Sequence, residues 1–147
     1  MGRHRITLTV AALLLASLVL PAAAGAHALP TMSHASARTA RLSLQAADAY
    51  WLQRGRTGCA QPQIQYAALS QGASGDAFIG PNLPAAYCVI RVSTHLNWRG
   101  RAGAIDYCWT IVHERGHQTG LKHSSAGIMR SDGGDKPPSA CTRLFSS

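Results

Sequence analysis

Residues 104–123 read AIDYCWTIVHERGHQTGLKH, and this stretch is the starting point for the whole fold. Over residues 104–119 the side chains follow a helical period, with Ile105, Trp109, Val112 and Gly116 on one stripe. Apolar residues at this spacing are typical of a helix that packs one face against a core. The pattern therefore predicts a helix across residues 104–119.

The polar side chains at the end of this helix predict a metal site. His113 and His117 are four residues apart on one helical face, so both imidazole rings can point at one ion. Gly120 can adopt a positive φ and turn the chain, which lets His123 reach the same ion. Three neutral imidazoles leave a fourth position for water, as in catalytic zinc sites, and they suit zinc among the common metals. We predict one catalytic Zn²⁺ on the three histidines, with Glu114 beside it as the general base.

The segment HERGHQTGLKHSSAGIM, residues 113–129, resembles the metzincin metallopeptidases, which share HExxHxxGxxH followed by a methionine-containing turn. Ser124, directly after the third histidine, is most similar to the matrixin branch. The resemblance implies a small secreted zinc endopeptidase with Met129 in the methionine turn. Two positions depart from the family pattern. Only five residues separate His123 from Met129, fewer than is usual in matrixins, and Ser131 stands where some metzincins carry a metal-binding tyrosine.

The preceding residues predict one helix and several short strands. The helix covers residues 39–54, with apolar side chains at helical spacing and Gly55 where it ends. Alternating or β-branched stretches predict strands at 63–69, 76–80 and 87–94, separated by Gly- and Pro-rich turns. Together with the resemblance, this order predicts an α+β, metzincin-like domain: an N-terminal helix, a twisted mixed sheet, the zinc-binding helix and the methionine turn. An extended peptide substrate is expected along a sheet edge, at 76–80 or 85–87.

The N-terminus has the three parts of a secretory signal peptide. A basic start is followed by an apolar run over residues 6–20 and by the small-x-small sequence Ala26-His27-Ala28. We predict a signal peptide at 1–28, a mobile mature N-terminus at 29–38 and the metallopeptidase domain at 39–147, which makes the protein secreted and extracellular. An uncleaved anchor is the alternative, although the apolar run is short for a membrane-spanning helix.

All four cysteines lie after the predicted signal peptide. An even number of cysteines in an exported chain suggests two disulfides, and no CxxC pair supports metal binding by thiolates. Three pairings are possible. Sequence neighbourhood alone favours Cys59 with Cys88 and Cys108 with Cys141.

The formal charge of +8 comes from basic residues that are scattered along the chain. A nucleic-acid surface usually shows a concentrated patch or a recognisable module, so we expect no specific nucleic-acid partner. We expect instead a monomer that acts on a peptide or protein substrate. Two other classes remain open: a non-catalytic secreted domain that keeps zinc for stability, and a cationic surface-binding protein with an incidental motif. Glu114 favours the enzyme, since a binding domain does not need that carboxylate.

Overall fold

The computed structural model describes residues 34–132 and 136–146, so the predicted signal peptide and residues 29–33 lie outside the described residues. Within these ranges the helices are α1 (Ala37–Leu52), α2 (Gly100–Gln118) and α3 (Ser139–Leu144). The strands are β1 (Gln63–Ala67), β2 (Gly75–Ala77) and β3 (Val89–Ser93). Two short 3-10 helices are η1 (Ala85–Tyr87) and η2 (Gly127–Met129). No helix in the described ranges is long and apolar enough to cross a bilayer.

The strands form one mixed sheet in the order β1-β3-β2. β1 runs parallel to β3, whereas β2 runs antiparallel to it and forms an edge of the sheet. This arrangement confirms the prediction of an α+β domain with a mixed sheet. The predicted strand at 76–80 ends early because Gly80 donates its N–H to the carbonyl of His117 instead of to the sheet. Residues 85–87 are not extended but form η1, so the expectation of a strand-like edge there is wrong.

Helix α1 forms slightly earlier in the chain than predicted. The Ser36 hydroxyl accepts a hydrogen bond from the Thr39 N–H at 3.1 Å and caps the helix start. The predicted mobile segment therefore ends in two helical residues, 37 and 38. After the helix, Gly55 has a φ of 67°, a conformation that favours glycine and turns the chain away.

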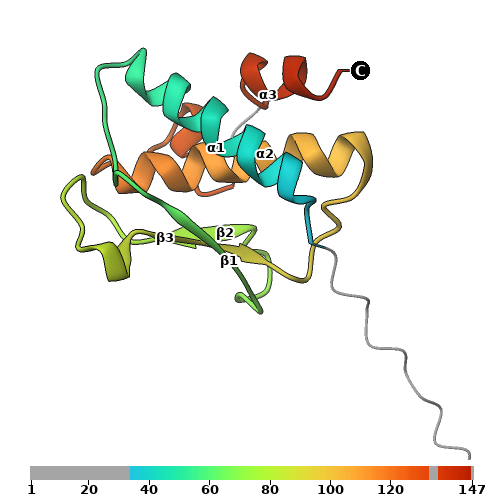
Figure 1. The fold of residues 1–147 in the computed structure, drawn as a ribbon, viewed down its shortest axis with the longest axis horizontal. Coiled ribbons are helices and arrows are strands. Elements are labelled where there is room, and N and C mark those ends of the chain that lie inside the picture. Colours follow the sequence, from blue (N-terminus) through green and yellow to red (C-terminus); the bar gives the residue numbers. More distant parts are fainter. Residues whose placement is uncertain (1–33, 133–135, 147) are drawn as a thin grey trace, which may run out of the picture.

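Helix α2 is the central element of the molecule (Figure 1), in contact with α1 on one side and with β2 and β3 on another. The Trp51 indole on α1 donates to the Val112 carbonyl at 2.7 Å, which joins the two helices through a buried bond. The prediction of one buried stripe is wrong for α2. Ile105 and Trp109 are only half-buried, whereas every residue from 110 to 118 is buried, because α1, the sheet and η2 together enclose this half of the helix.

Two disulfides cross-link the fold, and both have the pairing that sequence neighbourhood favoured. Cys59 bonds to Cys88, with 5.7 Å between their Cα atoms, and joins the segment after α1 to the start of β3. Cys108 bonds to Cys141, with a Cα separation of 5.6 Å, and joins α2 to α3. The disulfides add to the stability of the fold, because a domain of this size gains only limited stability from its hydrophobic core alone.

All four thiols are therefore expected to be oxidised in the purified, folded protein. Intact mass measured after alkylation without reductant should equal the unmodified mass. Alkylation after full reduction should add four groups, which serves as the control. Two or more alkyl groups on the unreduced, folded protein would contradict the disulfide assignment.

Candidate metal centre

Three histidines converge where α2 ends. His113 and His117 come from the helix and His123 from the segment that follows it, and their ligand atoms all lie within 4.8 Å of one another. The Nε2 atom of His123 lies 3.2 Å from Nε2 of His113 and 3.2 Å from Nε2 of His117. Two ligands on a tetrahedral ion with bonds of about 2.0–2.1 Å are about 3.3 Å apart. The cluster can therefore hold a metal ion through the three Nε2 atoms.

Backbone carbonyls set the tautomer of the two helical histidines. Nδ1 of His113 lies 2.6 Å from the Ile128 carbonyl oxygen, and Nδ1 of His117 lies 2.8 Å from the Leu121 carbonyl oxygen. A carbonyl can only accept, so each Nδ1 must carry the proton. The lone pair of a neutral ring is then on Nε2, facing the cluster. Burial also lowers the pKa of both histidines and so favours the neutral form that binds metal.

Gly120 turns the chain as its position in the motif predicted. Its φ is 91°, and its N–H donates to the His117 carbonyl at 2.9 Å. The next residue, Leu121, donates back to the Gly116 carbonyl at 3.2 Å. These bonds close the helix end in the left-handed conformation that glycine adopts readily. The tight reversal brings exposed His123 back over the buried helical pair.

Glu114 lies beside the histidines as a buried carboxylate. It is only 4% exposed, and its Oε2 has no hydrogen-bond partner among the described residues. Burial, together with the nearby charge of Asp76, raises the pKa of Glu114 to about 8. A cation on the histidines would lower that pKa again, because an opposite charge favours the ionised form. Burying a carboxylate without a hydrogen-bond partner costs free energy of folding, and such groups are typical of catalytic sites.

The position of Gly75 was missed from the sequence. A Cβ atom there would lie 2.7 Å from Cγ2 of Thr110 and 2.9 Å from Cγ of Glu114, so only glycine allows β2 to approach the helix this closely. The residue stands in the Gly- and Ser-rich segment 70–75, which predicted only a turn. The absence of a side chain at Gly75 was the one feature of the sequence that could have indicated a close approach of backbone to helix. Its effect is to place an edge strand directly beside the carboxylate.

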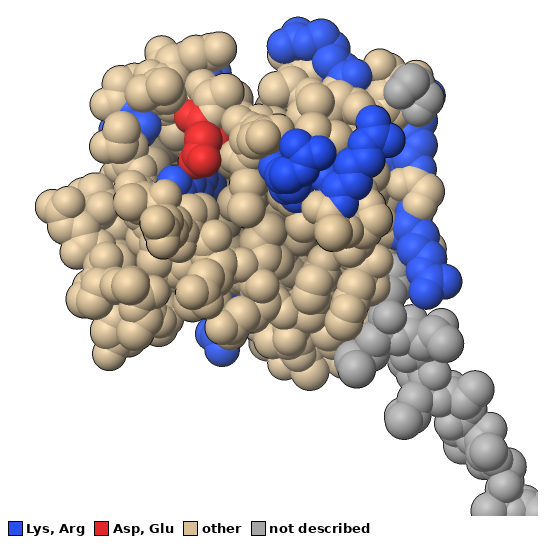
Figure 2. Space-filling view, viewed as in Figure 1, with Lys and Arg blue, Asp and Glu red and all other residues tan. Residues whose placement is uncertain are grey.

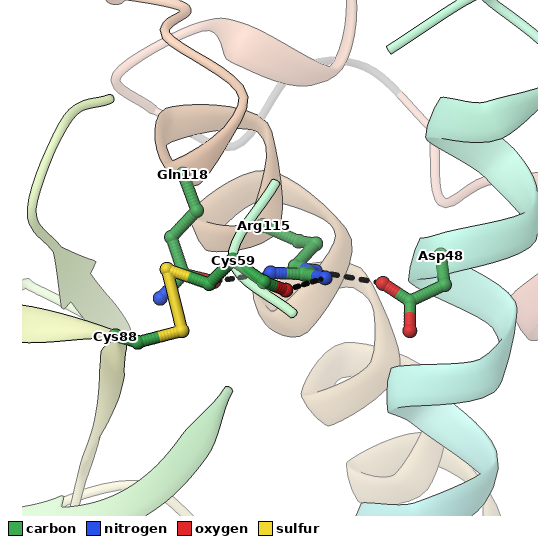
Figure 3. The surroundings of a disulfide bond; sticks show 5 residues. All are labelled: Asp48, Cys59, Cys88, Arg115 and Gln118. Atoms are coloured by element: carbon green, nitrogen blue, oxygen red, sulfur yellow. Dashed lines mark hydrogen bonds and ion pairs between the residues drawn. A yellow bond between two sulfur atoms is a disulfide. The ribbon is translucent and has the colours of Figure 1, made fainter. Parts of the chain in front are cut away.

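Arg115, on the same turn of α2 as Glu114, connects the helix to other parts of the fold (Figure 3). Its guanidinium donates to the Asp48 carboxylate at 2.7 Å, to the Gln118 side-chain oxygen at 2.8 Å and to the Cys59 carbonyl at 2.6 Å. One buried side chain thus connects α2 to α1 and to the segment held by the Cys59–Cys88 disulfide. Asp48 and Cys59 lie 67 and 56 residues from Arg115 in the sequence, which is why the motif gave no sign of the network.

Met129 lies under the turn that brings the three histidines together. It is 5% exposed, and a Cβ built on Gly116 would come within 2.4 Å of its sulfur and 2.6 Å of Cζ2 of Trp51. The backbone of α2 therefore rests directly on the methionine and the tryptophan. Ser124 donates its N–H to the Met129 carbonyl at 2.9 Å, which closes the loop that carries His123.

Replacing Gly116 by valine is therefore expected to destabilise the protein by about 3 kcal/mol or more, because a branched side chain cannot fit between Met129 and Trp51. Urea unfolding followed by circular dichroism measures the change. Ala102→Val, at an exposed position of the same helix, is the matched control and should lower stability by less than about 1 kcal/mol. Equal effects of the two substitutions would show that Gly116 is not closely packed.

The remaining described histidines do not join the cluster. His34 stacks on Tyr66, with ring centroids 4.0 Å apart, and His95 is exposed. The assembled group is thus the triad that the motif predicted, with Glu114 next to it. No protein-family model matches the chain, and no curated protein or solved structure matches it either.

Proposed function

We propose that this protein is a secreted zinc-dependent endopeptidase of the metzincin type, acting as a monomer on peptide or protein substrates. The observation that carries the proposal is the buried Glu114 carboxylate, whose Oε2 has no hydrogen-bond partner within the described part of the chain. It lies next to three histidines whose Nε2 atoms face one another. The motif HExxHxxGxxH supports the same reading, and the burial of Met129 beneath the site is compatible with a methionine turn. Two disulfides fit an extracellular protein.

Zinc is the metal best suited to this ligand set, since three imidazoles without a thiolate leave a fourth position for water. When bound, it would polarise the scissile carbonyl and bring the pKa of a coordinated water to about 7. The chain itself supplies the base. Glu114 takes the proton of the attacking water and later returns it to the leaving amine. Its burial excludes competing solvent from the carboxylate.

Strand β2 is the proposed platform for the substrate. It is an edge of the sheet, and Gly75 brings its backbone against Thr110 and Glu114. An extended peptide that adds to this edge would pass directly over the histidines. The main-chain hydrogen bonds of such an added strand give affinity that does not depend on the peptide sequence. Pockets beside the strand then select particular side chains.

The alternative is a secreted binding domain that the metal only stabilises. A domain that uses the metal only for stability does not need a buried carboxylate. In such a domain, an amide or an apolar residue in place of Glu114 would raise stability, because burying a carboxylate without a hydrogen bond costs free energy. The position of Glu114 therefore favours the enzyme.

Hydrolysis of a broad peptide library, followed by mass spectrometry, tests the proposed function. Zinc-loaded protein should cleave internal bonds, and chelation followed by dialysis should remove this activity. Adding one equivalent of zinc should restore it, because metal ligands on one triad define one site. Magnesium added to the chelated protein is the control and should restore nothing. Cleavage that persists at full rate in metal-free protein would contradict a zinc mechanism.

A further inference from the structure

A cavity of about 510 Å³ opens beside the proposed catalytic residues, on the side of the N-terminal half of α2. Its lining contains Asp106, Glu114 and Asp132, which are three of the six acidic residues in the chain. Among the residues that the structure describes, no lysine or arginine belongs to the lining. This concentration of acidic side chains stands out in a chain with a formal charge of +8. On the face shown in Figure 2, by contrast, basic side chains predominate and acidic ones occupy one small area.

We propose that this cavity receives the cationic side chain of a lysine or arginine that directly follows the bond to be cleaved, with Asp106 as the main specificity residue. The inference rests on the proposed peptidase function and adds to it the class of side chain that the enzyme selects. A basic side chain is the ligand that a cavity with an excess of carboxylates favours by charge complementarity.

Asp106 is at the right distance from the site for this task. It precedes His113 by seven residues on α2, which is two helical turns on the same face and about 10 Å along the axis. A long side chain that begins near the scissile bond would bring its charged end toward this carboxylate. Trp109, between the two positions, lines the cavity and offers an apolar wall for the methylene stem.

Asp106 is also available for a partner. It is exposed, and it makes no ion pair or side-chain hydrogen bond with any of the described residues. Asp132, in contrast, is already paired with Arg130. A second observation points to a polar ligand in the same cavity. Glu114 lines it and is 4% exposed, and its Oε2 has no hydrogen-bond partner in residues 34–132 and 136–146. The free charge of Asp106 is therefore the one that a substrate can neutralise.

The direction of β2 indicates which substrate residue enters the cavity. The strand begins at Gly75, which together with residues 72–74 lines the acidic cavity, and it ends at Ala77, beside a second cavity that includes Lys122. Antiparallel pairing is the commoner arrangement for an added strand. A peptide bound in that direction passes Ala77 first and the acidic cavity afterwards. The cavity then holds the residue on the C-terminal side of the cleaved bond.

Library digestion by the zinc-loaded wild type, Asp106→Asn and Asp106→Glu tests the inference. Wild type should cleave preferentially before lysine and arginine. Asp106→Asn should lower kcat/KM for a peptide with lysine after the bond about tenfold or more, and should change the matched leucine peptide by less than about threefold. Asp106→Glu should restore most of the lysine preference. Gln45→Lys, at an exposed position of α1, changes the net charge of the protein by the same amount as Asp106→Asn. It should leave kcat/KM for both peptides unchanged.

The outcomes separate the two proposals. Cleavage without enrichment of basic residues after the bond, or an equal loss for both peptides in Asp106→Asn, would overturn the role of the cavity and leave the peptidase intact. An absence of any cleavage by zinc-loaded wild type would refute the peptidase function and this inference with it.

Discussion

Replacing His117 by alanine is expected to abolish stoichiometric zinc binding. The substitution removes a buried ligand whose Nδ1 is fixed by the Leu121 carbonyl and whose Nε2 lies 3.2 Å from that of His123. Loss of an outer-shell partner alone typically lowers metal affinity by about 10- to 100-fold, so loss of a ligand should lower it by more than about 100-fold. Elemental analysis after dialysis should give about one zinc per chain for wild type and close to none for the variant.

His95→Ala is the matched control for this prediction, because His95 is an exposed histidine outside the cluster. It should bind zinc as wild type does. Far-UV circular dichroism of His117→Ala should still show the helices, since two disulfides and the contact between α1 and α2 remain. A folded His117→Ala protein that keeps one tightly bound zinc would exclude the three-histidine site.

The cluster of three histidines could be predicted from the sequence because its arrangement is local. Two histidines four residues apart share a helical face in any helix, and Gly120 is the kind of residue that can reverse the chain at its end. The structure places all three rings together by this local geometry. The carbonyls that set the ring tautomers, from Ile128 and Leu121, belong to the turns that follow and carry no residue-type signal.

The long-range features could not be predicted in the same way. The mixed sheet requires β1 and β3 to run parallel, with β2 inserted between them in sequence but added at the edge in space. Nothing in the alternation of side chains specifies that order. Likewise, residues 110–118 of α2 are buried on all sides because separate parts of the chain cover them, whereas periodicity could indicate only one face.

The acidic cavity is a further consequence of tertiary structure. Asp106 and Asp132 are separated by more than twenty residues, and each looks like an ordinary surface carboxylate in the sequence. They become one charged site only because the loop after η2 returns to the helix that carries Asp106. The proposed choice of substrate would therefore depend on tertiary contacts that the motif does not encode, although the motif indicates the proposed chemistry.

Replacing Glu114 by alanine is expected to keep zinc and the fold while peptide hydrolysis falls by several orders of magnitude. Glu114 is not one of the three clustered histidines, so the triad proposed to bind the metal is unchanged. General acid–base catalysis is typically worth about 10²- to 10⁴-fold, and the same carboxylate is proposed to act on both the water and the leaving amine. Single-turnover and steady-state rates on the best library peptide, with zinc content measured in parallel, give the comparison.

Glu114→Gln distinguishes the loss of a base from the loss of a side chain, because the amide fills nearly the same space and cannot take a proton. Both variants should be inactive, and neither should be less stable than wild type, since each removes a buried carboxylate whose Oε2 has no hydrogen bond within the described residues. A purely structural zinc site predicts no hydrolysis in wild type either. Equal peptidase rates in wild type and Glu114→Ala, with zinc present in both, would refute the proposed mechanism and leave the histidine cluster without a catalytic role.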